Sequence, residues 1–217
     1  MSIVVAAVDN IAGLIVVDTR LCGSEADVPI GKMYPLPHIG AALAGRGSAR
    51  ILGMLAVEAA TSGMTFEALA ETLPKLISRY TALVADDLRL LPNRERRQEF
   101  FLLGWPNGAD RVALHVYVQQ GPDELVEHQV QRPDDLSGYV TAAPWLPEFG
   151  PVPTLSDVSS IEGIVSIARL QIAAMNLQWA PKSAGGDLVL ARIERDGMVI
   201  QRLGFVDDEP IARRAAA

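Results

Sequence analysis

Ser2 is the first residue whose type and position could do chemistry. If Met1 is removed, Ser2 carries a hydroxyl together with a free α-amine, and an unperturbed α-amine with a pKa of about 7.7–8.0 accepts a proton near neutral pH. A terminal hydroxyl with its own amine as general base is a known route to an activated nucleophile. The pattern predicts attack on a carbonyl carbon; the alternative is that Ser2 is an ordinary small second residue.

The flanking segments are expected to bring two charged residues toward Ser2. Residues 3–8 and 14–17 are short apolar runs, a pattern typical of two strands joined by a turn. Between them stand three residues that favour turns: Asp9, Asn10 and Gly13. An antiparallel hairpin returns the end of its second strand to the start of its first. Asp18 and Arg20 are therefore predicted to lie close to Ser2.

The composition is that of a packed globular protein and limits the classes of partner. The chain has 217 residues, of which 49% are hydrophobic and 21% charged, as is ordinary for a folded domain. Its net charge is −7 and its pI is about 5.0. A nucleic-acid-binding surface needs a basic patch, so we expect no nucleic-acid partner.

The N-terminus and the cysteine content favour the cytoplasm. The first residues lack the basic segment of a signal peptide, and Asp9 interrupts the apolar stretch early. No run of about 18 apolar residues occurs, so no membrane span is expected. Cys22 is the only cysteine, which excludes an intrachain disulfide and fits a reducing compartment. We expect a cytoplasmic protein without a membrane partner.

The order of the expected elements indicates an α+β fold. Helices are predicted at 49–60 after a cap at Ser48, at 66 to about 90 after a cap at Thr65, and from 156 to before Pro181. Further strands are predicted at 32–37, 39–43, 99–105, 111–118, 124–130, 138–142, 187–193 and 198–205, with a charged link at 92–98 and a hairpin turn at Asp196-Gly197. Runs of strands separated by runs of helices favour α+β layers, with two sheets face to face and helices outside. We find no internal repeat or linker, so residues 1–217 are expected to form one domain.

Six stretches, taken in order, resemble a known family. They are Ser2-Ile3-Val4, Val17-Asp18-Thr19-Arg20, Lys32-Met33-Tyr34, Ala44-Gly45-Arg46-Gly47-Ser48-Ala49, Phe101 to Trp105, and Ser183 to Asp187 continued by Arg195-Asp196-Gly197. Together they span nearly the whole chain and resemble the proteasome β-type subunits of the N-terminal-nucleophile (Ntn) hydrolases. The resemblance implies the four-layer αββα sandwich of that family and a bacterial homologue that has diverged from it.

The resemblance also implies a role for each polar residue of the site. Lys32 would make the terminal hydroxyl more acidic through its charge, and Asp18 would hold Lys32 by a charged hydrogen bond. Arg20 would order the site, Gly47 would offer its backbone N–H to the oxyanion, and Ser183 would support the amine. The plainer alternatives are a solvated lysine, a turn aspartate, a turn glycine with positive φ and a loop serine.

Two functions follow from the resemblance. The first is hydrolysis of an amide or peptide bond by Ser2, with a peptide or a small amide as substrate. The second is a catalytically inactive proteasome-fold subunit with a structural or assembly role. Serine stands where the family usually has threonine. The family's mid-chain Gly-Ser-Gly with its supporting serine is not visible, Pro-Glu-Phe-Gly-Pro standing near there instead, and Ala180 stands where the family has an aspartate; the missing supporting serine and aspartate favour the second function. Ser2, Asp18 and Lys32 together favour the first, because unpaired buried charges are costly.

In either case the resemblance implies a self-assembling homo-oligomer, a ring being one such assembly. The apolar helices predicted at 49–60 and 66–90 are candidate subunit surfaces. No cofactor is expected. No metal site is expected either, because the three histidines, at positions 38, 115 and 128, lack the spacing of metal ligands.

Overall fold

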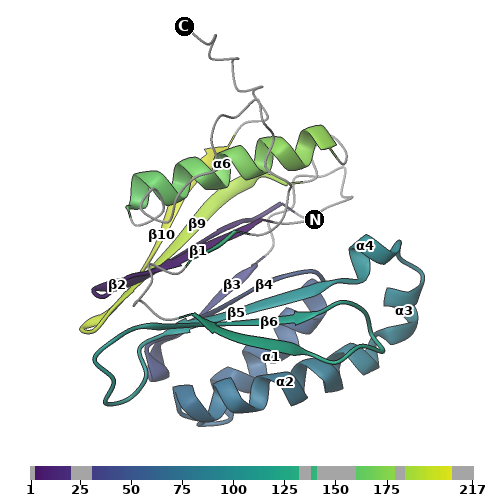
Figure 1. Cartoon of the computed structure of the whole chain (residues 1–217), viewed down its shortest axis with the longest axis horizontal. Coiled ribbons are helices and arrows are strands. Elements are labelled where there is room, and N and C mark those ends of the chain that lie inside the picture. Colours follow the sequence, from purple (N-terminus) through teal and green to yellow (C-terminus); the bar gives the residue numbers. More distant parts are fainter. Residues whose placement is uncertain (1–2, 21–30, 132–137, 141–159, 179–183, 207–217) are drawn as a thin grey trace, which may run out of the picture.

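Two antiparallel sheets form the centre of the computed structural model, which describes residues 3–20, 31–131, 138–140, 160–178 and 184–206 (Figure 1). The first sheet has the order β10 (Gly197–Val206), β9 (Gly186–Glu194), β2 (Ala12–Asp18), β1 (Val4–Val8) and β8 (Gly138–Val140). The second has the order β3 (Met33–Leu36), β4 (Ala41–Arg46), β5 (Gln98–Gly104), β6 (Ala113–Gln119) and β7 (Glu127–Gln131). The helices are α1 (Ala49–Thr61), α2 (Phe66–Leu83), α3 (Ala85–Arg89), α4 (Asn93–Arg96) and α6 (Ile161–Gln178), with a 3₁₀ turn η1 (Pro37–Ile39).

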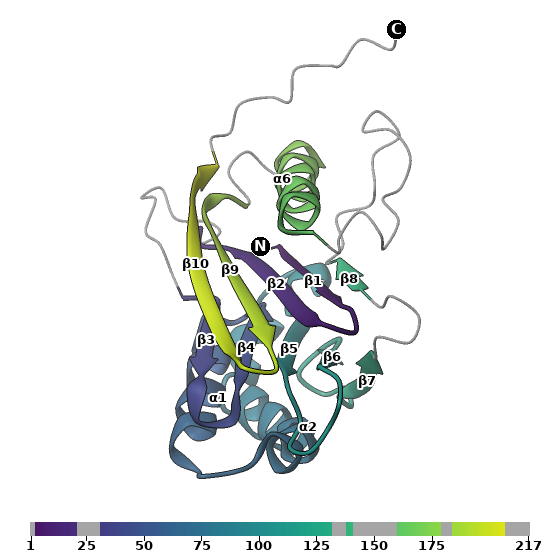
Figure 2. The same cartoon turned by 90° about the vertical axis from the view of Figure 1, so that its left-hand side faces the viewer.

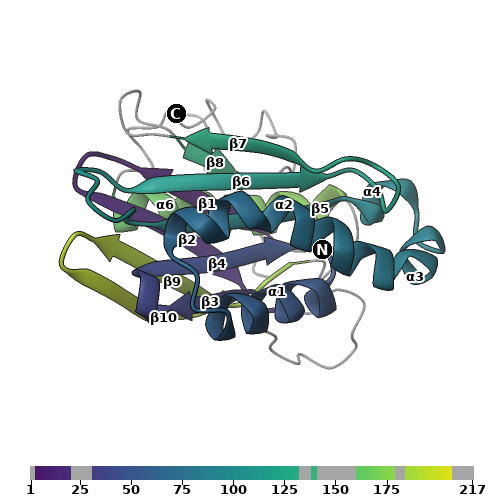
Figure 3. The same cartoon turned by 90° about the horizontal axis from the view of Figure 1, so that it is seen from below.

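Helices lie on the outer side of each sheet. Figures 1 and 2 show α6 over the first sheet, and Figure 3, seen from below, shows α1 and α2 across the second. Successive residues of a strand point to opposite faces, so Val5 packs in the cluster shared with α6 while Val4 packs between the sheets. Likewise Phe100 packs toward α1 and α2, and Phe101 packs between the sheets. The mixed α+β class expected from the sequence is confirmed.

The predicted first hairpin forms, between β1 and β2. Val4 lies opposite Val17, and the Asp9 carboxylate closes the turn by accepting hydrogen bonds at 2.7 Å from the N–H groups of residues 11 and 12. Gly13 is not a turn residue, contrary to the prediction, but belongs to β2. A Cβ at Gly13 would lie 2.6 Å from the Leu103 side chain of the facing sheet, so this glycine lets the two sheets approach.

The two helices that cover the second sheet begin where the sequence predicts. The Ser48 hydroxyl accepts a hydrogen bond from the N–H of Ile51 at 3.4 Å, and Thr65 caps α2 in the same way. The prediction of one helix from 66 to about 90 is wrong. Helix α2 ends at Leu83, because Val84 has φ −122° and leaves the helical conformation before the short helix α3 begins.

Several strand boundaries also differ from the prediction. Strand β4 starts only at Ala41, because η1 and Gly40, at φ +58°, turn the chain first. It then continues through Gly45, whose missing side chain leaves room for Phe100 and Leu52. The predicted charged link at 92–98 contains the short helix α4. The turn of the last hairpin is formed by residues 195–196, and Gly197, predicted in the turn, is already paired in β10. The predicted start of the third helix, at 156, lies outside the described residues.

No helix among the described residues combines the length and the apolar character that crossing a bilayer requires.

Candidate active site

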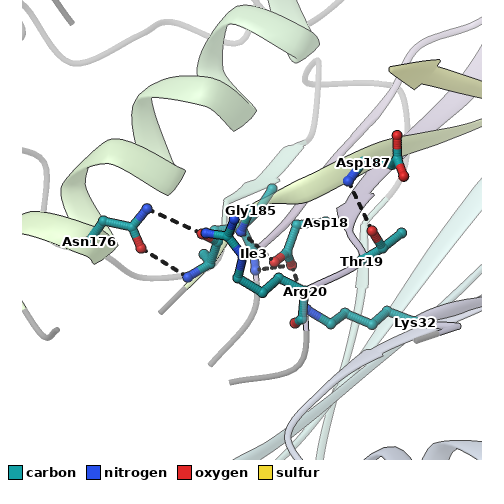
Figure 4. Close-up of polar contacts among 9 residues, drawn as sticks. Ile3, Asp18, Thr19, Arg20, Lys32, Asn176, Gly185 and Asp187 are labelled. Carbon is teal, nitrogen blue, oxygen red and sulfur yellow. Dashed lines mark hydrogen bonds and ion pairs between the residues drawn. The ribbon is translucent and has the colours of Figure 1, made fainter. Parts of the chain in front are cut away.

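Asp18 is the centre of a buried polar cluster at the end of the first hairpin. It is the last residue of β2, and its side chain is fully buried. Its Oδ1 accepts hydrogen bonds from the Ile3 backbone N–H and from Lys32 Nζ, each at 2.9 Å. Its Oδ2 accepts a third, from the Gly185 N–H, also at 2.9 Å (Figure 4). Three donors from three separate segments therefore converge on one carboxylate.

Lys32 brings the second sheet into this cluster. Its carbonyl oxygen accepts a hydrogen bond from the Gly45 N–H at 3.0 Å, which fixes the Lys32 backbone beside β4. Its side chain is buried and reaches Asp18 of the first sheet, where it also donates to the carbonyl of Arg20. The buried ammonium group thus links the two sheets at the point where β2 ends and β3 begins. Hydrogen bonds of this charge-assisted kind are the stronger ones in proteins.

Arg20 holds the segment that precedes β9. Its backbone N–H donates to the Gly185 carbonyl at 2.9 Å, and its Nη1 donates to the Ala184 carbonyl at 3.0 Å. The Asn176 side chain, from α6, also bonds Ala184, as donor to its carbonyl at 3.2 Å and as acceptor from its N–H at 3.0 Å. The segment carrying the Gly185 N–H is therefore fixed from two sides.

Two glycines at the start of β9 are required by this close packing. Gly185 has φ +135°, and a Cβ there would lie 2.8 Å from Arg20 Nη1. Gly186 has φ +79°, and a Cβ there would lie 2.8 Å from the Thr19 hydroxyl. That hydroxyl in turn accepts a hydrogen bond from the Asp187 N–H at 2.9 Å. Positive φ and the absence of a side chain are both properties of glycine.

Gly47 lies at the same end of the second sheet as Lys32. It directly follows β4, two residues after the Gly45–Lys32 backbone hydrogen bond. Its φ is +121°, and a Cβ there would lie 2.3 Å from Gln98 Oε1. The same oxygen accepts the Ser48 N–H at 2.6 Å, so the buried Gln98 amide fixes this turn.

The predicted site residues have different outcomes. Asp18, Arg20 and Lys32 come together as expected, and Gly47 stands in the turn with positive φ, while Ser2 and Ser183 lie outside the described residues. Ser2 is joined to Ile3, whose N–H binds Asp18. Sequence reasoning missed Asn176 and Gln98, because the groups that each binds belong to the backbone of distant segments. A polar residue inside an apolar helix was the only signal for Asn176.

The described residues contain no group of three or more His, Cys, Asp or Glu side chains placed to hold a metal ion.

Comparison with known proteins adds evidence on the fold. No protein-family model matches the sequence, and no curated protein matches it. Among solved structures, the Anbu (Gly-1) mutant from Hyphomicrobium sp. strain MC1 is similar, with a TM-score of 0.62 and 13% sequence identity. The match covers 96% of this chain and 90% of the Anbu chain. Because Anbu is a bacterial protein of the proteasome-like type, the likeness supports a proteasome-like fold, and at this identity it supports the fold alone.

Proposed function

We propose that the protein is an amide or peptide hydrolase whose nucleophile is Ser2 after removal of Met1. The observation that carries the proposal is the buried Asp18 carboxylate, which binds both Lys32 Nζ and the N–H of Ile3. Burying a lysine and an aspartate costs desolvation energy that an apolar pair would avoid. Their place beside Ile3, the residue that follows Ser2, gives that cost a chemical purpose.

The proposed reaction begins with attack of the Ser2 hydroxyl on the substrate carbonyl. The α-amine of the same residue takes the hydroxyl proton, and the Lys32 ammonium favours the developing alkoxide. Asp18 holds Lys32 in place through the hydrogen bond at 2.9 Å. The Gly47 N–H is the proposed donor to the oxyanion of the tetrahedral intermediate, since it lies at the Lys32 end of its sheet.

Collapse of this intermediate completes the first half of the reaction. The carbon–nitrogen bond breaks, the α-ammonium returns its proton to the departing amine, and an ester joins Ser2 to the acyl group. Water then attacks the ester with the α-amine again as base. The products are a free acid and the regenerated hydroxyl, so no cofactor is needed in the proposed reaction.

The proposal includes the layered architecture and the extent of the domain. Three apolar clusters lie one above another: between α6 and the first sheet, between the sheets, and between the second sheet and α1 with α2. Such a stack is what the four-layer αββα sandwich of Ntn hydrolases requires. We propose that residues 1–217 form one such domain.

Hydrolysis of model peptides and acyl amides tests the proposed activity. Ser2→Ala should lower kcat/KM by about 10³-fold or more, because the nucleophile is lost. Ser166→Ala is the matched control, since Ser166 lies exposed on α6 and its substitution should leave the rate unchanged. Equal rates for the wild type and Ser2→Ala would show that another residue, or a contaminant, does the chemistry.

A catalytically inactive, structural role is the second candidate. It is favoured by Ala180, which stands upstream of Ser183 where the related hydrolases have an aspartate. This candidate predicts a folded protein without hydrolytic activity and without reaction of Ser2 with electrophiles. Either activity or covalent labelling of Ser2 would rule it out.

For both candidates we propose that the protein assembles with itself. The helices α1 and α2 bury one face on the second sheet and leave apolar side chains outward, with Val57 65% and Leu83 64% exposed. Sedimentation velocity on the purified chain should show an oligomer. A single monomeric species across the micromolar range would contradict this part of the proposal.

A further inference from the structure

We propose that Asn176 is a positioning residue that holds the Asp18 carboxylate in place through the backbone of Ala184 and Gly185. The consequence for catalysis rests on the proposed function. The effect on Asp18 can be measured without any substrate.

All four backbone polar groups of Ala184 and Gly185 have hydrogen-bond partners (Figure 4). The Asn176 side chain accepts a hydrogen bond from the Ala184 N–H and donates one to the Ala184 carbonyl. The same carbonyl accepts a hydrogen bond from Arg20 Nη1. The Gly185 carbonyl accepts the Arg20 N–H, and the Gly185 N–H donates to Asp18 Oδ2. Buried backbone groups are seldom left without partners, and here three side chains satisfy most of them.

Asn176 supplies the part of this arrangement that comes from outside β2. Asp18 is the last residue of β2 and Arg20 follows it by two residues, whereas Asn176 belongs to α6, whose Ile172 and Met175 are buried against the first sheet. The amide of Asn176 pairs with Ala184 as a neighbouring strand would, through one donor and one acceptor. It therefore fixes the segment relative to the helix, and with it the direction of the Gly185 N–H.

The two carboxylate oxygens of Asp18 bind different donors. Oδ2 accepts the Gly185 N–H, while Oδ1 accepts the Ile3 N–H and Lys32 Nζ. The χ2 torsion of an aspartate has a broad, roughly two-fold preference, so the donors around it set the orientation of the carboxylate. A displaced Gly185 N–H would let the group rotate and would weaken both contacts at Oδ1.

Hydrogen exchange of single amides, followed by NMR, tests this role. Asn176→Leu removes both side-chain hydrogen bonds to Ala184, and it should speed exchange of the Gly185 and Ile3 amides by about 10-fold or more while Leu190 in β9 stays protected. Asn176→Asp keeps the acceptor for the Ala184 N–H and loses the donor, so it should give a smaller effect at the same two amides. Leu177→Ala is the matched control, because the neighbouring Leu177 is 70% exposed.

Unchanged protection of Gly185 in Asn176→Leu would overturn the proposal. If that variant loses protection along the whole chain, Asn176→Asp decides: selective loss at Gly185 supports the proposal, and its absence overturns it. Kinetics then separate the two proposals, since a positioning residue should lower kcat more than it raises KM, with partial rescue in Asn176→Asp. Selective amide loss in a protein without hydrolytic activity would refute the proposed function alone, whereas lost activity with unchanged amides would refute the positioning role alone.

Discussion

Substitution of Lys32 by methionine tests whether the buried ion pair joins the two sheets. The change keeps the length of the side chain but removes the ammonium that lies 2.9 Å from Asp18 Oδ1, in a place where the lysine is 3% exposed. The carboxylate then stays buried with only its two backbone donors. Removing one partner of a buried ion pair costs about 3–5 kcal/mol. At about 2–4 °C per kcal/mol for a domain of this size, the melting temperature should fall by about 6–20 °C.

A double-mutant cycle gives the sharper form of this prediction. Lys32→Met, Asp18→Asn and the double variant are compared by urea unfolding, and Lys75→Met, at an exposed position of α2, serves as the control. The control should change the free energy of unfolding by no more than about 0.5 kcal/mol. Residues in one network couple by about 0.5–3 kcal/mol, so we expect the double variant to be at least about 1.5 kcal/mol more stable than additivity predicts. Additive effects, within about 0.5 kcal/mol, would refute the reasoning.

Three further predictions concern single residues. Gly185→Ala should lower the free energy of unfolding by about 1–3 kcal/mol in urea, and by more than Gly63→Ala does. Both glycines have positive φ, but of these two only Gly185 has a close neighbour that a Cβ would meet; equal losses would contradict this. Gln98→Leu leaves the Ser48 N–H without its acceptor and should cost about 1–3 kcal/mol; an unchanged unfolding midpoint would count against it. Burial lowers the pKa of His128 below its usual 6.5, so stability should fall as the pH drops through that range, and His128→Gln should reduce the fall. Urea titrations at several pH values measure this slope, and an identical slope in the variant would show that other groups cause it.

The sequence predicts best the parts of the site that depend on local structure. The hairpin of β1 and β2 is coded by two apolar runs and a turn, and its register alone brings Asp18 beside Ile3. The caps at Ser48 and Thr65 are equally local. For these residues the side chain and the backbone N–H that it binds are a few positions apart in the sequence or are joined by one turn.

The parts that sequence reasoning missed depend on contacts between distant segments. Gln98 and Asn176 bind backbone groups, which every residue possesses, so no pairing of residue types points to them. Gly13 looks like a turn residue until Leu103 of the other sheet lies against it. The break after Leu83 follows from the backbone at Val84, although the apolar spacing of the sequence continues to Leu88.

The intact mass of the purified protein, before and after treatment with a β-lactone that acylates nucleophilic hydroxyls, tests the central claim most directly. The account predicts a chain that lacks Met1 and gains one acyl group, located on the N-terminal peptide and absent from Ser2→Ala. A chain that keeps Met1 has no free amine at Ser2. That result, or a processed chain that gains no adduct, would contradict the assignment of Ser2 as the nucleophile.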